Sequence, residues 1–151
     1  MATGADSIQR RLDAFTEACH ERGLKVTHQR VEIYRELVSS EDHPDAESIH
    51  RGVRRRIPTI SLDTVYRNLK FMAEQGLLST VGLSHERLRF DANMVSHHHF
   101  VCEECGSIRD FTCTDFDGMR LPRGASKLGR PHSAQVHVKG ICNVCLGGRR
   151  K

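Results

Sequence analysis

Two Cys-x-x-Cys pairs constrain the fold of this chain more than any other feature, because they predict where one metal ion joins distant segments. The paired cysteines, with 36 residues between the two pairs, are Cys102, Cys105, Cys142 and Cys145. Two such turns can supply the four thiolates of a closed, tetrahedral structural zinc site. The alternative is two disulfide or redox-active pairs, which a reducing cytosol disfavours. The sequence therefore predicts a zinc ion that stabilises the C-terminal part, whereas Cys19 and Cys113 are predicted to be small apolar residues.

Length and charge restrict the classes of protein that remain. The chain has 151 residues, which suggests one or two small domains. No apolar run approaches the roughly 20 residues of a membrane span, and the first residues lack the apolar core of a secretory signal, so we expect a cytoplasmic protein with no membrane partner. The net charge is +4, yet residues 1–91 hold 14 basic and 14 acidic side chains. Overall charge therefore does not establish nucleic-acid binding.

The N-terminal part has the apolar spacing of four amphipathic helices. The first carries Ile8, Leu12, Phe15 and Cys19 on one face and ends near Gly23. The other three are expected to begin after the capping residues Thr27, Asp45 and Ser61. Pro44 and Pro58 separate these segments, and Gly76 is expected to end the fourth helix.

Two short strands are expected after the helices, at Leu77–Val81 and Glu86–Asp91, joined by residues 82–85. Four helices followed by a hairpin predict a winged helix-turn-helix, in which one helix enters the DNA major groove. Tyr66 and Arg67 lie on the polar face of the fourth helix and are the candidate base contacts. The candidate phosphate contacts are Arg54, Arg55 and Arg56, although a solvated turn explains these arginines equally well.

A second group of possible metal ligands contains no sulfur. His97 and His99 flank His98, and alternate residues of a strand share a face, so the outer two can bind one ion. Asp91 and Asp110 lie near them in sequence, and His43 lies between the second and third helices. Taken singly, His43 is also explained as a helix-end residue, Asp110 as a strand-edge charge, and the histidine run as a solvated loop.

With these motifs in order, the chain resembles the ferric uptake regulator (Fur) family, and most closely its peroxide-sensing branch. The resemblance extends over about residues 8–146. It is carried by Val26-Thr27-His28-Gln29-Arg30, His43-Pro44, Thr64-Val65-Tyr66-Arg67-Asn68-Leu69, Gly76-Leu77, Arg89-Phe90-Asp91, the His97-x-His99 pair and both Cys-x-x-Cys pairs.

The resemblance implies an α+β fold with two domains and two metal sites. It implies a winged-helix DNA-binding domain over residues 1–91, a hinge to about 96, and a homodimerising α/β domain over 97–151 that the four-cysteine zinc stabilises. It also implies a regulatory Fe(II) or Mn(II) site whose ligands are His43, Asp91, His97, His99 and Asp110. In peroxide sensors of the family, the ligands that become oxidised match His43 and His97.

Three departures from the family pattern affect what is expected. Ala134 stands where iron regulators commonly carry a histidine, which argues against a further metal site of their kind, although His132 or His137 could partly replace it. His98 stands where iron regulators tend to have an aspartate. Glycines and a proline over residues 117–125 predict that a helix found in relatives is short or absent here.

Donor chemistry gives the regulatory site an expected reaction. Three imidazoles and two carboxylates suit Fe(II) or Mn(II), and five ligands leave one position where peroxide can bind. Oxidation of a ligand histidine would release the metal, and with it the palindromic operator DNA. The alternatives are an iron- or zinc-uptake regulator of the same fold, a metalloenzyme, or a zinc-stabilised interaction module. An enzyme is not expected, because the chain has no HExxH, nucleophile-elbow or phosphate-loop motif, and no organic cofactor is expected either.

Overall fold

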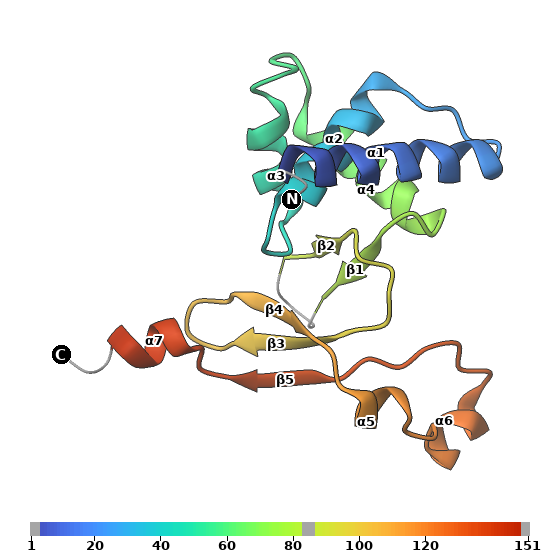
Figure 1. Cartoon of the computed structure of the whole chain (residues 1–151), viewed down its shortest axis with the longest axis vertical. Coiled ribbons are helices and arrows are strands. Elements are labelled where there is room, and N and C mark those ends of the chain that lie inside the picture. Colours follow the sequence, from blue (N-terminus) through green and yellow to red (C-terminus); the bar gives the residue numbers. More distant parts are fainter. Residues whose placement is uncertain (1–3, 83–86, 149–151) are drawn as a thin grey trace. The chain divides into compact units, whose positions relative to one another are not determined.

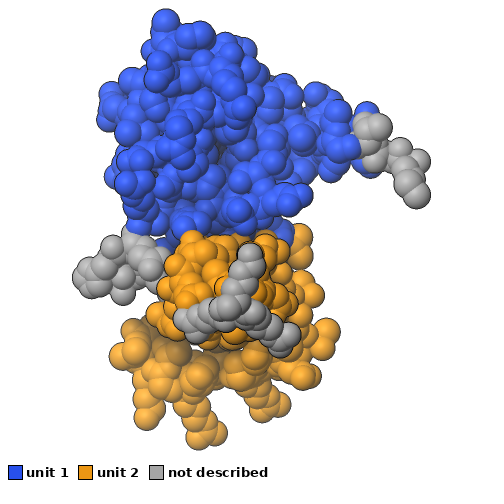
Figure 2. Space-filling model, turned by 90° about the vertical axis from the view of Figure 1, so that its left-hand side faces the viewer, with its two compact units in different colours: residues 1–94 blue, residues 95–151 orange. Residues whose placement is uncertain are grey.

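The computed structural model describes residues 4–82 and 87–148. The chain divides into two compact units, Met1–Met94 and Val95–Lys151, which are hereafter called unit 1 and unit 2 (Figure 2). Unit 1 holds four helices and a two-stranded sheet, and unit 2 holds a three-stranded sheet with short helices (Figure 1). The predicted α+β class is confirmed. Within the described residues, no helix is both long enough and apolar enough to cross a bilayer.

The helices of unit 1 begin at the capping residues that the sequence predicts. They are α1 Gly4–Glu21, α2 His28–Ser39, α3 Ala46–Val53 and α4 Leu62–Glu74. Thr27 accepts a hydrogen bond from the Arg30 amide at 3.2 Å, and Asp45 accepts one from the Ser48 amide at 2.8 Å. The Ser61 hydroxyl accepts one from the Thr64 amide at 3.0 Å. Each side chain thus satisfies an amide that lacks a partner within its helix.

The four helices enclose one apolar core. Phe15 of α1 stacks on Tyr34 of α2 with ring centroids 4.2 Å apart. The apolar faces of α3 and α4 close this core, and the largest fully buried side chains of unit 1 are Phe90, Ile33, Ile49, Leu69, Met72 and Leu78. After α1 and α4, Gly23 (φ 66°) and Gly76 (φ 70°) adopt the left-handed conformation that a helix end requires. The core therefore fixes the orientation of α4 relative to the other helices of unit 1.

A small hairpin completes unit 1. Strand β1, Ser79–Val81, pairs antiparallel with β2, Arg89–Asp91. Strand β1 is two residues shorter than predicted, because Leu77 and Leu78 are buried in the helical core. Most of the predicted connection, residues 83–85, lies outside the described residues, as does Glu86 at the start of the second predicted strand. The segment before α3 also pairs with β2, since the Phe90 amide donates to the Pro44 carbonyl at 3.0 Å.

Unit 2 is built on a sheet with β3 in the centre. Strand β3, His98–Cys102, pairs antiparallel with β4, Ile108–Phe111, and parallel with β5, His137–Gly140. Two short helices, α5 Thr114–Asp117 and α6 Arg123–Leu128, occupy the segment in which we expected a short or absent helix. Helix α7, Asn143–Gly148, begins directly after Cys142, contains Cys145 and was not predicted.

Candidate functional site

The four paired cysteines of unit 2 converge. The Sγ atoms of all four lie within 4.8 Å of one another. The Cys102 and Cys145 sulfurs are 3.9 Å apart, and the Cys105 and Cys142 sulfurs are 3.8 Å apart. Cys102 ends β3, Cys105 lies in the turn before β4, and Cys142 and Cys145 lie at the start of α7. All six cysteines of the chain are free of disulfides.

The arrangement of these sulfurs fits a zinc ion. Zn–S bonds of about 2.3 Å at tetrahedral angles place sulfurs roughly 3.8 Å apart, close to the two distances given above. Amides of Cys105 and Cys142 point at the Cys102 sulfur and lower the pKa of its thiol to about 6. The hydroxyl of Ser107 likewise lowers the pKa of Cys105. Because zinc binds thiolates, both effects favour metal binding by Cys102 and Cys105, whereas the Cys142 sulfur raises the pKa of Cys145.

In unit 1, His43 and Asp91 form a pair of potential ligands. The His43 Nδ1 and Asp91 Oδ2 atoms are 3.8 Å apart, and both side chains are buried. His43 follows α2, and Asp91 ends β2. The Arg89 side chain donates to the His43 carbonyl at 3.3 Å, and this contact ties the His43 segment to β2. Because the Phe90 amide is hydrogen-bonded to the Pro44 carbonyl, the neighbouring residues His43 and Asp91 lie side by side.

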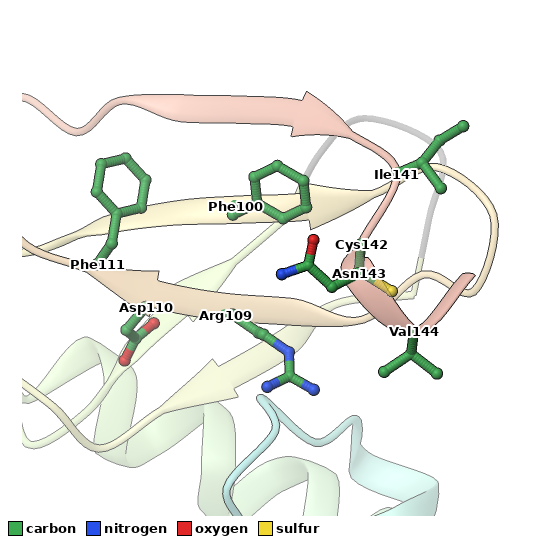
Figure 3. Close-up of a pocket in the computed structure, with 8 residues that line it drawn as sticks. All are labelled: Phe100, Arg109, Asp110, Phe111, Ile141, Cys142, Asn143 and Val144. Atoms are coloured by element: carbon green, nitrogen blue, oxygen red, sulfur yellow. The ribbon is translucent and has the colours of Figure 1, made fainter. Parts of the chain in front are cut away.

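In unit 2, His97, His99 and Asp110 form a second set. The Asp110 Oδ1 atom lies 3.6 Å from the His97 Nε2 atom and 3.5 Å from the His99 Nε2 atom. His99 and Asp110 are direct partners across β3 and β4, and Asp110 points to the opposite side of β4 from Phe111 (Figure 3). The His97 Nδ1 atom lies 2.6 Å from the Val95 carbonyl. That hydrogen bond places the proton on Nδ1 and leaves Nε2 as a metal donor.

The neighbouring histidines have different surroundings. His98 points to the other face of β3, as the alternation predicts. Its Nδ1 atom accepts from the Val136 amide at 3.2 Å, so its Nε2 atom donates to Asp117 at 3.0 Å. His98 therefore joins β3 to the segments on either side. His137 lies next to His99 on the parallel strand, with ring centroids 5.1 Å apart.

The polar face of α4 carries the predicted base contacts. The Tyr66 side chain is 45% exposed. The Arg67 side chain is 77% exposed and binds Asp63, with 2.8 Å between its Nε atom and the carboxylate. The second turn of α4 thus presents an aromatic ring and a guanidinium to solvent.

The three arginines after α3 differ in their partners. Arg56 forms ion pairs with the buried Glu32 and, at 2.9 Å, with Glu36 of α2. The Arg55 Nη2 atom lies 3.6 Å from a Glu36 oxygen, but the side chain is largely exposed. Arg54 ends α3 and is exposed. Arg56 thus packs α3 against α2, whereas Arg54 and Arg55 remain candidates for phosphate contacts.

Sequence reasoning did not predict two acidic residues next to this surface. Asp63 lies in the first turn of α4, and its i, i+4 spacing from Arg67 is a recognisable ion-pair signal. The Glu47 carboxylate lies 2.6 Å from the Arg87 guanidinium, which is 40 residues away in the chain. No local sequence signal indicates that second pair.

Comparison with known proteins gives consistent matches. Residues 21–127 match the model of the ferric uptake regulator family. The peroxide-responsive repressor PerR of Staphylococcus epidermidis is 30% identical over 146 residues, covering 96% of this chain and 97% of that protein. The structure of PerR from Streptococcus pyogenes is 29% identical with a TM-score of 0.51, covering 89% of this chain and 92% of that one. A zinc uptake regulator complexed with zinc and DNA is 20% identical with a TM-score of 0.75, and the match covers 99% and 100% of the two chains. That last likeness concerns the fold alone.

Proposed function

The chain belongs to the ferric uptake regulator family of metal-responsive transcriptional regulators, and from this premise we propose that it is a peroxide-sensing repressor. In this proposal, a cytoplasmic homodimer binds palindromic operator DNA while each protomer holds Fe(II) or Mn(II). Peroxide oxidises a ligand histidine, the metal leaves, and the operator is released. The four-cysteine zinc has only a structural role, because four sulfurs leave no position for a substrate.

One observation carries the proposal: each unit contains an incomplete set of nitrogen and oxygen ligands. Unit 1 offers His43 and Asp91, and unit 2 offers His97, His99 and Asp110. Two or three donors make a weak site alone, whereas five donors of this kind suit Fe(II) or Mn(II). We therefore propose that one ion takes ligands from both sets and thereby fixes the angle between the units.

Bound Fe(II) would supply the electrons that break the O–O bond of peroxide, a reaction that Mn(II) supports poorly. In the net reaction, one peroxide oxygen enters a ring C–H bond of histidine and the other leaves as water. We propose His43 and His97 as the oxidised residues. The Val95 carbonyl holds His97 in one tautomer, so its ring stays oriented for the reaction. An oxidised imidazole is a weaker donor, and the ion is lost.

Each DNA-binding unit would place α4 in a major groove. Tyr66 and Arg67 are the proposed base contacts, and Arg54 and Arg55 are the proposed phosphate contacts. We exclude Arg56 from this set because it is engaged with Glu32 and Glu36. A twofold dimer presents two such helices to a palindrome, so the angle between the units controls whether both can bind at once.

Unit 2 is the proposed site of dimerisation. It carries several exposed apolar side chains, including Val138, Val144 and Leu146. A groove of about 430 Å³ is lined by Phe100, Phe111, Ile141 and Val144 together with Arg109, Asp110, Cys142 and Asn143 (Figure 3). Exposed apolar side chains around such a groove are typical of a surface that binds another protein, and we propose that a second copy of this chain covers it.

The test is peroxide treatment of the iron-loaded and the manganese-loaded protein on an operator selected from random duplexes. We expect the iron form to lose operator affinity and gain 16 Da on a peptide containing His43 or His97, whereas the manganese form keeps its affinity. An iron form that still binds after treatment would instead indicate a regulator that responds to metal level. Failure of the metal-loaded protein to select any sequence would contradict the DNA-binding proposal itself.

A further inference from the structure

Two arginines near the proposed DNA surface bind carboxylates of their own unit. On α4, the exposed Arg67 is paired with Asp63, itself 66% exposed. On the wing side, the Arg87 guanidinium lies 2.6 Å from a Glu47 oxygen and 3.4 Å from an Asp45 oxygen. Arg87 is 68% exposed, so both guanidinium groups are accessible to a ligand.

One groove of unit 1 is lined by Asp63 of the first pair and by Arg87 with both of its carboxylate partners. This groove has a volume of about 680 Å³ and runs between the start of α3, the start of α4 and the residues just before β2. Its lining combines the apolar or aromatic residues Ala46, Leu62, Tyr66 and Leu88 with the charged residues Asp45, Glu47, Asp63 and Arg87. A DNA strand that passes beside α4 would therefore approach three carboxylates as well as the arginines.

This arrangement agrees with the charge of unit 1. Residues 1–91 contain equal numbers of basic and acidic side chains, which is unusual beside a surface proposed to bind a polyanion. Arg55 and Arg56 are paired with Glu36 as well. Most of the positive charge available for DNA is thus already balanced within the unit.

Building on the proposed DNA binding, we propose that Asp63 and Glu47 compete with DNA for Arg67 and Arg87. DNA can engage either arginine only after the carboxylate has released it. The competition weakens the binding of a single unit, so that a stable complex requires two units aligned on one operator. Asp63 and Glu47 are therefore determinants of specificity that need not touch DNA, because they limit the electrostatic binding that every sequence shares.

Exposed ion pairs of this kind are weak, and the expected effect is correspondingly moderate. Releasing one arginine should tighten DNA binding roughly two- to fivefold, so two copies in a dimer should give roughly tenfold. Each arginine that gains a phosphate should also steepen the salt dependence, by up to about 0.9 in the slope of log affinity against log salt.

The experiment uses the full-length, manganese-loaded dimer and its Asp63→Asn and Glu47→Gln variants. Fluorescence anisotropy measures binding to a duplex of random sequence and to the selected operator over a range of salt concentrations. Glu74→Gln, at the other end of α4, removes the same charge and is the matched control. Circular dichroism melting shows whether each variant is folded, and Asp63→Asn is measured again in the Arg67→Ala background.

We expect Asp63→Asn to tighten random-DNA binding about tenfold with a steeper salt slope. Glu47→Gln should tighten it by about fivefold, because Arg87 keeps its longer contact with Asp45, whereas Glu74→Gln changes it less than twofold. The gain from Asp63→Asn should disappear in the Arg67→Ala background. Affinity within twofold of wild type, or an equal gain from Glu74→Gln or without Arg67, would overturn the inference. A wild-type protein that selects no operator would instead overturn the proposed function, so the two failures are distinct.

Discussion

Removing the zinc should unfold unit 2 and leave unit 1 folded, because the two units have very different apolar cores. The buried apolar residues of unit 1 come from all four helices and the hairpin. In the described part of unit 2, the buried apolar residues are Val101, Ile108 and the zinc ligands Cys102 and Cys142. Burial of two aliphatic side chains contributes about 1.5–3 kcal/mol each, or roughly 3–6 kcal/mol together. Structural zinc binding contributes roughly 10–16 kcal/mol at neutral pH, so the metal stabilises unit 2 more than its buried aliphatic side chains do.

The perturbation is Cys142→Ser, with Cys113→Ser as the matched control at a cysteine outside the cluster. Zinc content is measured by elemental analysis, and amide hydrogen exchange is followed by mass spectrometry. We expect Cys142→Ser to lose zinc and protection over β3, β4 and β5, while α1–α4 keep theirs. Sustained protection of β3–β5 in a protein that has lost its zinc would refute the reasoning.

Three further changes test the packing of unit 1 by chemical denaturation. Phe90→Ala should destabilise the unit by about 3–5 kcal/mol, because this fully buried ring joins the wing to the helical core; a loss below 1 kcal/mol would contradict that placement. Arg56→Ala should cost about 2 kcal/mol, because the buried Glu32 carboxylate then keeps only the longer, 3.4 Å contact with Arg35. A second change, Glu32→Gln, should restore much of the loss, whereas additive losses would count against the pairing. Asp45→Ala should cost about 1 kcal/mol at pH 7 through loss of the α3 cap. Burial opposes ionisation of Asp45, but the Ser48 amide and Arg87 lower its pKa overall. The stability that the ionised carboxylate contributes is therefore present above the unfolded pKa of 3.8 and is lost as the pH falls through the folded pKa. The cost of Asp45→Ala should accordingly be smaller at pH 2 than at pH 7.

Local signals were enough to predict most of unit 1. Thr27, Asp45 and Ser61 cap helices because a short polar side chain there satisfies an exposed amide, and this depends only on neighbouring residues. The helix end at Gly76 follows from local rules in the same way. The prediction that the first strand of the hairpin starts at Leu77 was wrong. Leu77 and Leu78 are buried in the helical core, which depends on tertiary packing and not on neighbouring residues.

Contacts between distant residues could not be predicted in this way. Arg56 lies 24 residues from Glu32, and His137 reaches His99 only through a parallel pairing with a long crossover. The cysteine pairs are an exception, because their spacing already specifies a common ion. Their convergence in unit 2 therefore followed from chemistry alone, without knowledge of the strands between them.

The central claim is that one ion takes ligands from both units, and Mn(II) titration calorimetry of the zinc-containing dimer tests it most directly. His43→Ala removes a ligand of unit 1, His97→Ala removes one of unit 2, and His132→Ala removes a histidine outside both sets. We predict one Mn(II) per chain in the wild type, and at least a tenfold loss of affinity in His43→Ala and in His97→Ala but not in His132→Ala. Undiminished Mn(II) affinity in either His43→Ala or His97→Ala would show that the ion belongs to a single unit and would contradict the account.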